Sequence, residues 1–165
     1  MKKENLILII CGIIAVILII IILFLVFGGK KEFVVGKDIE KEEINEFYYT
    51  YATTTNPPEY LRYHFFIHED KYKLFYELRK GDRLPLLEKD AVESKVIELS
   101  DDEWTSLYNY LENGIVTKRK EDIETGNSLS LFLYWKDDES KYQEYNFENG
   151  NIRIQFEEFC ASLIK

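Results

Sequence analysis

The chain has 165 residues, of which 46% are hydrophobic, and its 21 basic and 30 acidic residues give a formal charge of 21 − 30 = −9. The hydrophobic fraction excludes a disordered chain, the 8 glycines exclude a collagen-like repeat, and the 2 cysteines exclude a disulfide framework. From Asp38 onward the charge is 16 − 28 = −12, so a phosphate backbone would be repelled and nucleic acid is not an expected partner.

An uncharged apolar segment, residues 6–27, follows a short N-terminal tail, residues 1–5. As a helix, its 22 residues would extend about 33 Å, which matches a hydrocarbon core of roughly 30 Å. The sequence therefore predicts a transmembrane helix over 6–27. No ionisable group lies between Asn5 and Lys30, so we expect this helix to act as a tether and not as a proton or ion path.

Two other readings of this segment are less favoured. A cleavable signal peptide has an apolar stretch of roughly 7–15 residues, which is shorter than this one, although Val26-Phe27-Gly28 resembles a weak cleavage site. A lipoprotein anchor needs a small residue before its modified cysteine, whereas Cys11 follows an isoleucine. The flanking lysines are equal in number on both sides, so the short tail and the single downstream cysteine favour an extracytoplasmic C-terminal domain at the cell membrane.

Residues 28–43 combine glycines with mixed charge and are predicted to be a linker, which leaves residues 44–165 as one domain. Its first part alternates apolar and polar residues with period two, which is typical of strands with one buried face. Three such runs, joined in one place by Glu69-Asp70 as a tight turn, predict an antiparallel meander, and a fourth strand is expected near its end. The alternating apolar residues are Phe47, Tyr49 and Tyr51, then Leu61, Tyr63, Phe65 and Ile67, then Tyr72, Leu74, Tyr76 and Leu78. The fourth strand is indicated by Val96, Ile97 and Leu99.

At Ser100 the pattern changes to that of a helix. Ser100 and Glu103 form a capping box, and the acidic run 101–103 suits the positive end of a helix. The apolar residues recur at helical spacing up to Leu111, and Gly114 is a typical helix end. The acidic run is therefore explained by helix capping rather than as a calcium site or a catalytic acid pair.

After a polar loop, residues 117–127, the chain predicts a hairpin and a last helix. The alternation over 129–135, an acidic turn at 137–139 and a strand over 142–147 make the hairpin, and a helical apolar stripe then runs from Ile152 to Leu163. The predicted fold class is α+β, with about six antiparallel strands and two helices on one face, in the order ββββ-α-ββ-α. Cys160 falls on the apolar stripe of the last helix and is expected to be buried.

Four segments carry a resemblance to a known group of proteins: EFYYTYAT, SDDEWTSLYNYL, GNSLSLFLYW and FEEFCASLI. In element order and hydrophobic pattern, residues 44–165 resemble small extracytoplasmic domains that Gram-positive bacteria carry on membrane anchors or lipoprotein tails, most of them without a known function. The resemblance implies a location and an architecture. It assigns a role to no individual residue.

The two histidines, His64 and His68, are the first candidates for chemistry. On a helix their spacing would suit zinc, but on a strand they lie about 13 Å apart, too far to share one ion. We therefore expect two solvent-facing strand histidines and no metal or cofactor. The alternative function is a cell-envelope enzyme, a metal-assisted hydrolase that uses His64 or His68 with Glu69.

Aromatic residues form 15% of the chain, more than one buried sheet face requires. Where both alternations of a strand carry rings, the second face must be covered by the linker, by loops or by neighbouring side chains, or else it forms a binding patch. The candidate residues of that patch are Tyr48, Phe66, Phe75, Phe132 and Tyr134. The sequence thus predicts a non-enzymatic binding or accessory domain, with an envelope protein or a polysaccharide as partner.

Overall fold

The structure is a computed structural model that describes residues 13, 16–19, 33–53, 57–118, 128–135 and 143–165. The chain divides into two compact units, residues 1–32 and 33–165. In the first unit the described residues are helical with exposed side chains, and most of the predicted span 6–27, like the tail 1–5, lies outside the described residues. Within the described part of the chain, no helix has both the length and the hydropathy of a membrane span.

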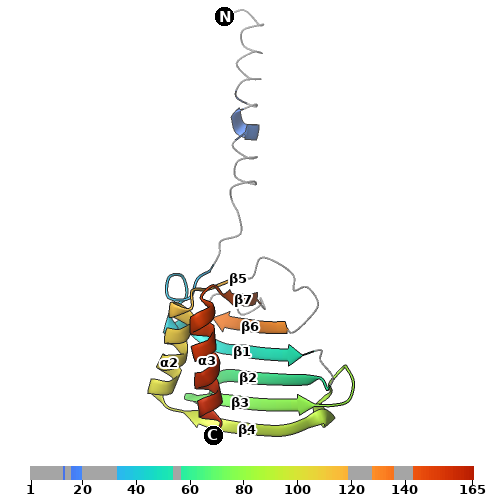
Figure 1. The fold of residues 1–165 in the computed structure, drawn as a ribbon. Helices are drawn as coiled ribbons and strands as arrows, with labels where there is room; N and C mark the ends of the chain where they lie inside the picture. The colour runs from blue at the N-terminus through green and yellow to red at the C-terminus, as the bar shows by residue number, and fades with distance from the viewer. Residues whose placement is uncertain (1–12, 14–15, 20–32, 54–56, 119–127, 136–142) are drawn as a thin grey trace, which may run out of the picture. The chain divides into compact units, whose positions relative to one another are not determined.

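The second unit is an α+β domain built on one seven-stranded antiparallel sheet, so the predicted class is confirmed (Figure 1). The strands lie in the order β4-β3-β2-β1-β6-β7-β5, and α2 and α3 lie against each other on one face of the sheet. The elements are β1 (Ile44–Thr53), β2 (Glu59–His68), β3 (Lys71–Lys80), β4 (Ala91–Leu99), α2 (Asp101–Asn113), β5 (Val116–Lys118), β6 (Ser128–Trp135), β7 (Gln143–Phe147) and α3 (Gly150–Leu163), with short 3₁₀ turns η1 (Lys41–Glu43) and η2 (Glu88–Asp90).

The prediction of about six strands in the order ββββ-α-ββ-α missed β5, which lies partly in the segment predicted as a polar loop. This strand has three residues, too few for an alternating pattern to be visible. It forms because its pairing with β7 places Val116 opposite Phe147 at the edge of the sheet. The predicted turn at 137–139 lies outside the described residues, but the pairing of β6 with β7 agrees with the predicted hairpin.

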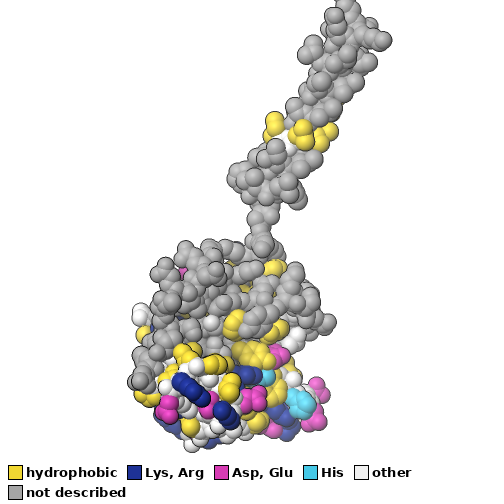
Figure 2. Space-filling model, turned by 90° about the vertical axis from the view of Figure 1, so that its right-hand side faces the viewer, with side chains coloured by type: hydrophobic (Ala, Val, Ile, Leu, Met, Phe, Trp, Pro, Cys, Tyr) yellow, Lys and Arg dark blue, Asp and Glu magenta, His cyan; other side chains and the backbone are white. Residues whose placement is uncertain are grey.

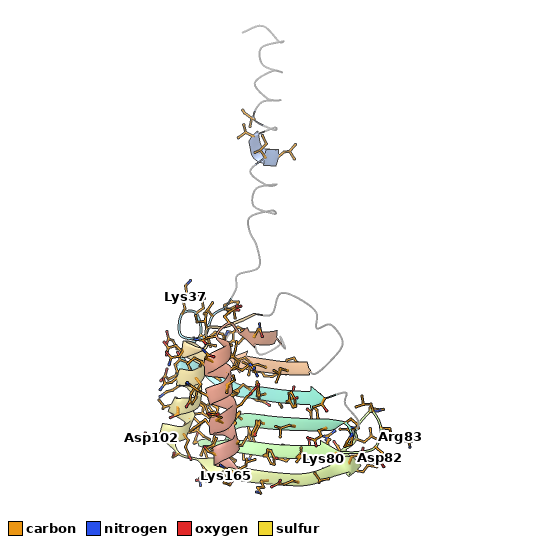
Figure 3. The ribbon with its side chains drawn as sticks, viewed as in Figure 1. Lys37, Lys80, Asp82, Arg83, Asp102 and Lys165 are labelled. Atoms are coloured by element: carbon orange, nitrogen blue, oxygen red, sulfur yellow. The ribbon has the colours of Figure 1, made fainter. Side chains whose placement is uncertain are left out.

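The core lies between the sheet and the two helices. The inward positions of the strands alternate as predicted except at Ile67, which is 42% exposed near the end of β2. To this core α2 adds Trp104, Leu107 and Leu111, and α3 adds Phe156 and Cys160. Each fully buried Leu or Phe contributes roughly 1.5–3 kcal/mol of hydrophobic free energy. The N-terminus of α2 forms as expected, because the Ser100 hydroxyl oxygen accepts a hydrogen bond from the backbone N–H of Glu103. Figure 3 marks Asp102 in the first turn of this helix.

The predicted linker 28–43 extends too far, because the ordered domain begins at Phe33. Val35 and Ile39 are only 2% and 0% exposed and belong to the core. Val34 bridges to Thr117 of β5, and Val35 bridges to Ile39, so this segment closes the edge of the domain. The sequence did not reveal this, because a short apolar patch between charged residues predicts little by itself and its partner, β5, is distant in sequence.

Gly114 ends α2 for a different reason from the one expected. Its φ is −75°, and the left-handed conformation falls on the next residue, Ile115, with a φ of 52°. A Cβ on Gly114 would lie 2.4 Å from the ring of Phe147 and 2.8 Å from the carbonyl oxygen of Tyr110. Glycine is therefore needed here for close packing against β7 and not for its backbone freedom.

Candidate functional site

The two α-helices of the domain, α2 and α3, lie on one face of the sheet, and the opposite face carries a second set of aromatic side chains. All five residues predicted for the patch lie there, half-buried, and none belongs to the hydrophobic core. In the view of Figure 2, hydrophobic, basic and acidic side chains are intermixed around the histidines. We define the aromatic face as these five residues and one histidine: Tyr48, His64, Phe66, Phe75, Phe132 and Tyr134.

Strand register places four of these side chains in one row across adjacent strands. Tyr48 of β1 pairs with His64 of β2 and with Phe132 of β6, and His64 pairs with Phe75 of β3. With strands about 4.8 Å apart, this row is about 14 Å long. In the neighbouring row, Phe66 and Tyr134 lie on either side of a glutamate. The sheet thus holds its rings on rigid elements.

His64 occupies the centre of the aromatic face. Its ring stacks on Tyr48, with centroids 4.1 Å apart and planes inclined by 13°, and lies 4.7 Å from the ring of Phe66. Burial lowers the pKa of His64, and the opposing effect of the carboxylate of Glu46 is smaller. A neutral imidazole donates from Nε2 to Oε1 of Glu46 over 2.6 Å. The prediction that His64 faces solvent is therefore wrong, because its side chain is 17% exposed and belongs to the stack.

Arg62 lies beside this row on β2. The guanidinium carbon is 5.1 Å from the ring centroid of Tyr48 and 5.9 Å from that of Phe75. Its Nε atom is buried and has no hydrogen-bond partner among the described residues. A cation over aromatic faces gains roughly 0.5–2 kcal/mol, so this arrangement orients the guanidinium between two rings of the aromatic face.

A second arginine, Arg79 of β3, extends this surface towards Glu59, the first residue of β2. Arg79 donates from Nη2 to Oε2 of Glu77 over 2.8 Å, and the side chains are only 15% and 8% exposed. Its guanidinium carbon also lies 5.3 Å from the ring centroid of Tyr60. The hydrogen bond to Glu77 raises the pKa of Arg79, so this arginine remains charged. Such an ion pair fixes the orientation of its partners.

The arrangement required by the hydrolase alternative does not form at His64, whose carboxylate partner is Glu46 and not Glu69. His68 lies 4.0 Å from Glu69, and their side chains are 59% and 78% exposed in the turn between β2 and β3. Across the described segments, no group of three or more His, Cys, Asp or Glu side chains could hold a metal ion. Cys160 is buried in the core as predicted, and burial raises the pKa of its thiol.

Sequence reasoning placed the five rings on one face but missed the polar groups between them. Along their strands, Glu46, His64 and Arg62 alternate in step with Tyr48 and Phe66, so the sequence pattern alone places them on the same face. What it could not supply was the register that brings Glu46 beside His64 across two strands. The site combines flat aromatic surface with oriented donors and acceptors.

Comparisons of this chain with protein-family models, with curated proteins and with solved structures give no match.

Proposed function

We propose that this chain is a binding domain that contacts a protein partner through the aromatic face. The observation that supports it most directly is the row of four rings, Phe75, His64, Tyr48 and Phe132, on the side of the sheet away from α2 and α3. Rings on adjacent strands have little conformational freedom to lose on binding. Aromatic and arginine side chains are also the residues most enriched at the energetic centres of protein interfaces.

The charges around the aromatic face favour a protein over a polysaccharide. At one margin Lys71 pairs with Glu98 over 2.8 Å, and both side chains are more than half exposed. Towards the other margin Arg79 and Glu77 form a second ion pair, but their side chains are only 15% and 8% exposed, so the exposed charges lie at the Lys71 margin. An aromatic centre with an exposed ion pair at its margin resembles the usual anatomy of protein interfaces. A polysaccharide partner is a separate outcome of the experiment below.

The chain is further proposed to hold this domain outside the cell on a membrane anchor, as in the Gram-positive domains that it resembles. The support is the uncharged segment 6–27. Recovery of the full chain in the membrane fraction, resistant to alkaline wash and released by detergent, is the expected result. Recovery of the intact chain in the soluble fraction would contradict the anchor.

Orientation can be tested with a cysteine introduced at Ser162, which is exposed on α3, because native Cys160 is fully buried. An impermeant maleimide is expected to label the Ser162→Cys protein in intact cells. The unsubstituted domain serves as control and should react at Cys160 only after denaturation. Labelling of the variant only after lysis would place the domain inside the cell.

The binding proposal is tested by photo-crosslinking in living cells. A photoreactive phenylalanine analogue replaces Phe66 on the aromatic face, and in a matched control it replaces Ile154 on α3, which is 47% exposed. The proposal expects one discrete protein adduct from position 66 and none from position 154. Equal adducts from both positions, a carbohydrate adduct alone, or no adduct would contradict it.

A further inference from the structure

A cavity of about 540 Å³ lies on the helix side of the sheet, opposite to the aromatic face. Its floor is one cross-strand row in which Tyr51 of β1 pairs with Leu61 of β2 and Leu129 of β6. The strands continue past α3 on this side (Figure 1), so the row is half-buried where the preceding row of Tyr49 and Tyr63 is buried. The cavity therefore arises because the strands are longer than the surface that α3 covers.

One wall of the cavity is a stripe of α3. Arg153, Glu157 and Ala161 recur every four residues, which places them on the same side of the helix. The small side chain of Ala161 leaves space above the floor, while the other two bring polar groups to the cavity. The result is a mostly apolar floor of ring and leucine side chains that faces a wall with the two charged groups, which is the usual composition of a small-molecule site.

The polar groups form one hydrogen-bond network that leaves some donors and acceptors for a ligand. The Tyr49 hydroxyl and Nη1 of Arg153 both donate to the same oxygen of Glu157, Oε1. Among the described residues, Oε2 of Glu157 receives no hydrogen bond. The guanidinium has further N–H groups beyond the one that it uses here. Burial raises the pKa of Tyr49, so its hydroxyl keeps its proton and remains a donor to Glu157.

The charges of the network determine which ligand fits. Arg153 and Glu157 are paired, so the cavity has no net charge from them to attract an anion or a cation. A purely apolar ligand would fill the floor but leave the free carboxylate oxygen and the free guanidinium N–H groups without partners, at a cost in desolvation. A neutral ligand with one apolar face and several hydroxyl groups satisfies both parts of the cavity.

We propose that this cavity binds a neutral saccharide. The C–H face of a sugar ring would lie on Tyr51 and the two leucines of the floor. Adjacent hydroxyls can donate to Oε2 of Glu157 and accept from Arg153, because each hydroxyl is both a donor and an acceptor. The volume lies within the roughly 300–1,000 Å³ of ligand sites. The cavity and the aromatic face share no residue, so a ligand can bind here whether or not a protein binds there.

The test uses the full chain in a detergent without a sugar headgroup, because alkyl glycosides would compete for the cavity. Maltose, cellobiose and N,N′-diacetylchitobiose are titrated by calorimetry and by saturation-transfer NMR. We expect at least one of them to bind. Tyr51→Ala and Glu157→Gln should each weaken binding at least ten-fold, while Tyr60→Ala on the opposite face should leave it within two-fold.

Tryptophan fluorescence in urea identifies any variant that fails to fold, since Trp104 and Trp135 are both buried in the domain. If Tyr51→Ala does not fold, the milder Tyr51→Leu keeps the apolar floor but removes the ring, and it should still weaken binding. Binding of none of the three sugars, or equal binding by the Glu157→Gln and parent chains, would overturn the proposal. Tighter binding of glucuronate than of the neutral sugars would also overturn it.

Discussion

Nε2 of His64 lies 2.6 Å from Oε1 of Glu46, so a half-buried imidazole and a carboxylate on neighbouring strands are joined by one hydrogen bond. The hydroxyl of Tyr48 donates to the same oxygen. Burial raises the pKa of Tyr48 and lowers that of His64, so both groups are neutral near pH 7. One carboxylate thereby orients two stacked rings.

This pairing predicts how the stability of the domain depends on pH. Because the pKa of His64 is lower in the folded chain than its ordinary value of 6.5, the unfolded chain takes up the proton first on acidification. The stability that neutral His64 contributes is therefore fully present above about pH 6.5 and is lost as the pH falls through the folded pKa. Relative to His64→Gln, whose amide can still donate to Glu46, the parent chain should lose stability over this interval.

The measurement is the urea midpoint of tryptophan fluorescence between pH 8 and pH 5. His68→Gln is the matched control, since His68 is 59% exposed and outside the stack, and its curve should follow that of the parent chain. A parent chain that gains stability relative to His64→Gln on acidification would show that His64 instead forms a salt bridge in its charged form, contrary to this account.

The turn between β2 and β3 predicts a stabilising substitution. Glu69 and Asp70 have φ values of 53° and 59°, a pair of left-handed residues that hairpin turns normally fill with Asn-Gly. Glu69→Asn with Asp70→Gly should raise the free energy of unfolding by about 1 kcal/mol, because the backbone strain is relieved. Asp82→Gly is the control and should bring no such gain, because Asp82 is a loop residue whose φ is not positive. Equal gains from both would argue against backbone strain as the cause.

The end of α2 predicts opposite effects at adjacent positions. Gly114→Ala should destabilise the domain by about 1–3 kcal/mol, since its Cβ would overlap the ring of Phe147. Ile115→Gly should stabilise it, because Ile115 is 51% exposed and holds a left-handed conformation unfavourable for a β-branched residue. Urea titration distinguishes the two. A neutral Gly114→Ala variant would show that Phe147 can move away.

The alternating runs made most of this fold predictable. Strands β1, β2 and β3 each have ten residues, long enough for period two to be distinguished from a helical period. The same alternation predicted which rings share a face. What it could not predict was the neighbour relationship of β1 and β6, which lie far apart in sequence and bring Tyr48 beside Phe132.

Long-range contacts also explain the two errors at the edges of the domain. A three-residue strand such as β5 needs its partner strand to form, and the segment that contains Val35 and Ile39 makes its contacts with β5 and with α2, which are distant in sequence. Local sequence carries little information about either. The central polar group of the aromatic face was missed for a similar reason, since Glu46 acquires its role through register.

The revised domain boundary predicts that the segment before β1 is structural. Ile39 is fully buried, so Ile39→Ala should lower the free energy of unfolding by roughly 2–5 kcal/mol. Lys37→Ala, at an exposed position of the same segment, is the control and should change it by less than about 0.5 kcal/mol. An Ile39→Ala chain as stable as the control would restore the view that these residues form a linker.

The proposed role of Phe75 and Tyr134 on the aromatic face is partner binding and not folding, whereas His64 also contributes to the stability of the domain. It is tested most directly by measuring, on one protein, both the yield of the photo-adduct from position 66 and the urea midpoint, after Phe75→Ser and Tyr134→Ser are introduced together. Both side chains are half-buried and outside the core. We expect an adduct yield at least ten-fold lower, with the domain still folded in the absence of urea. An unchanged yield from a folded domain would contradict it.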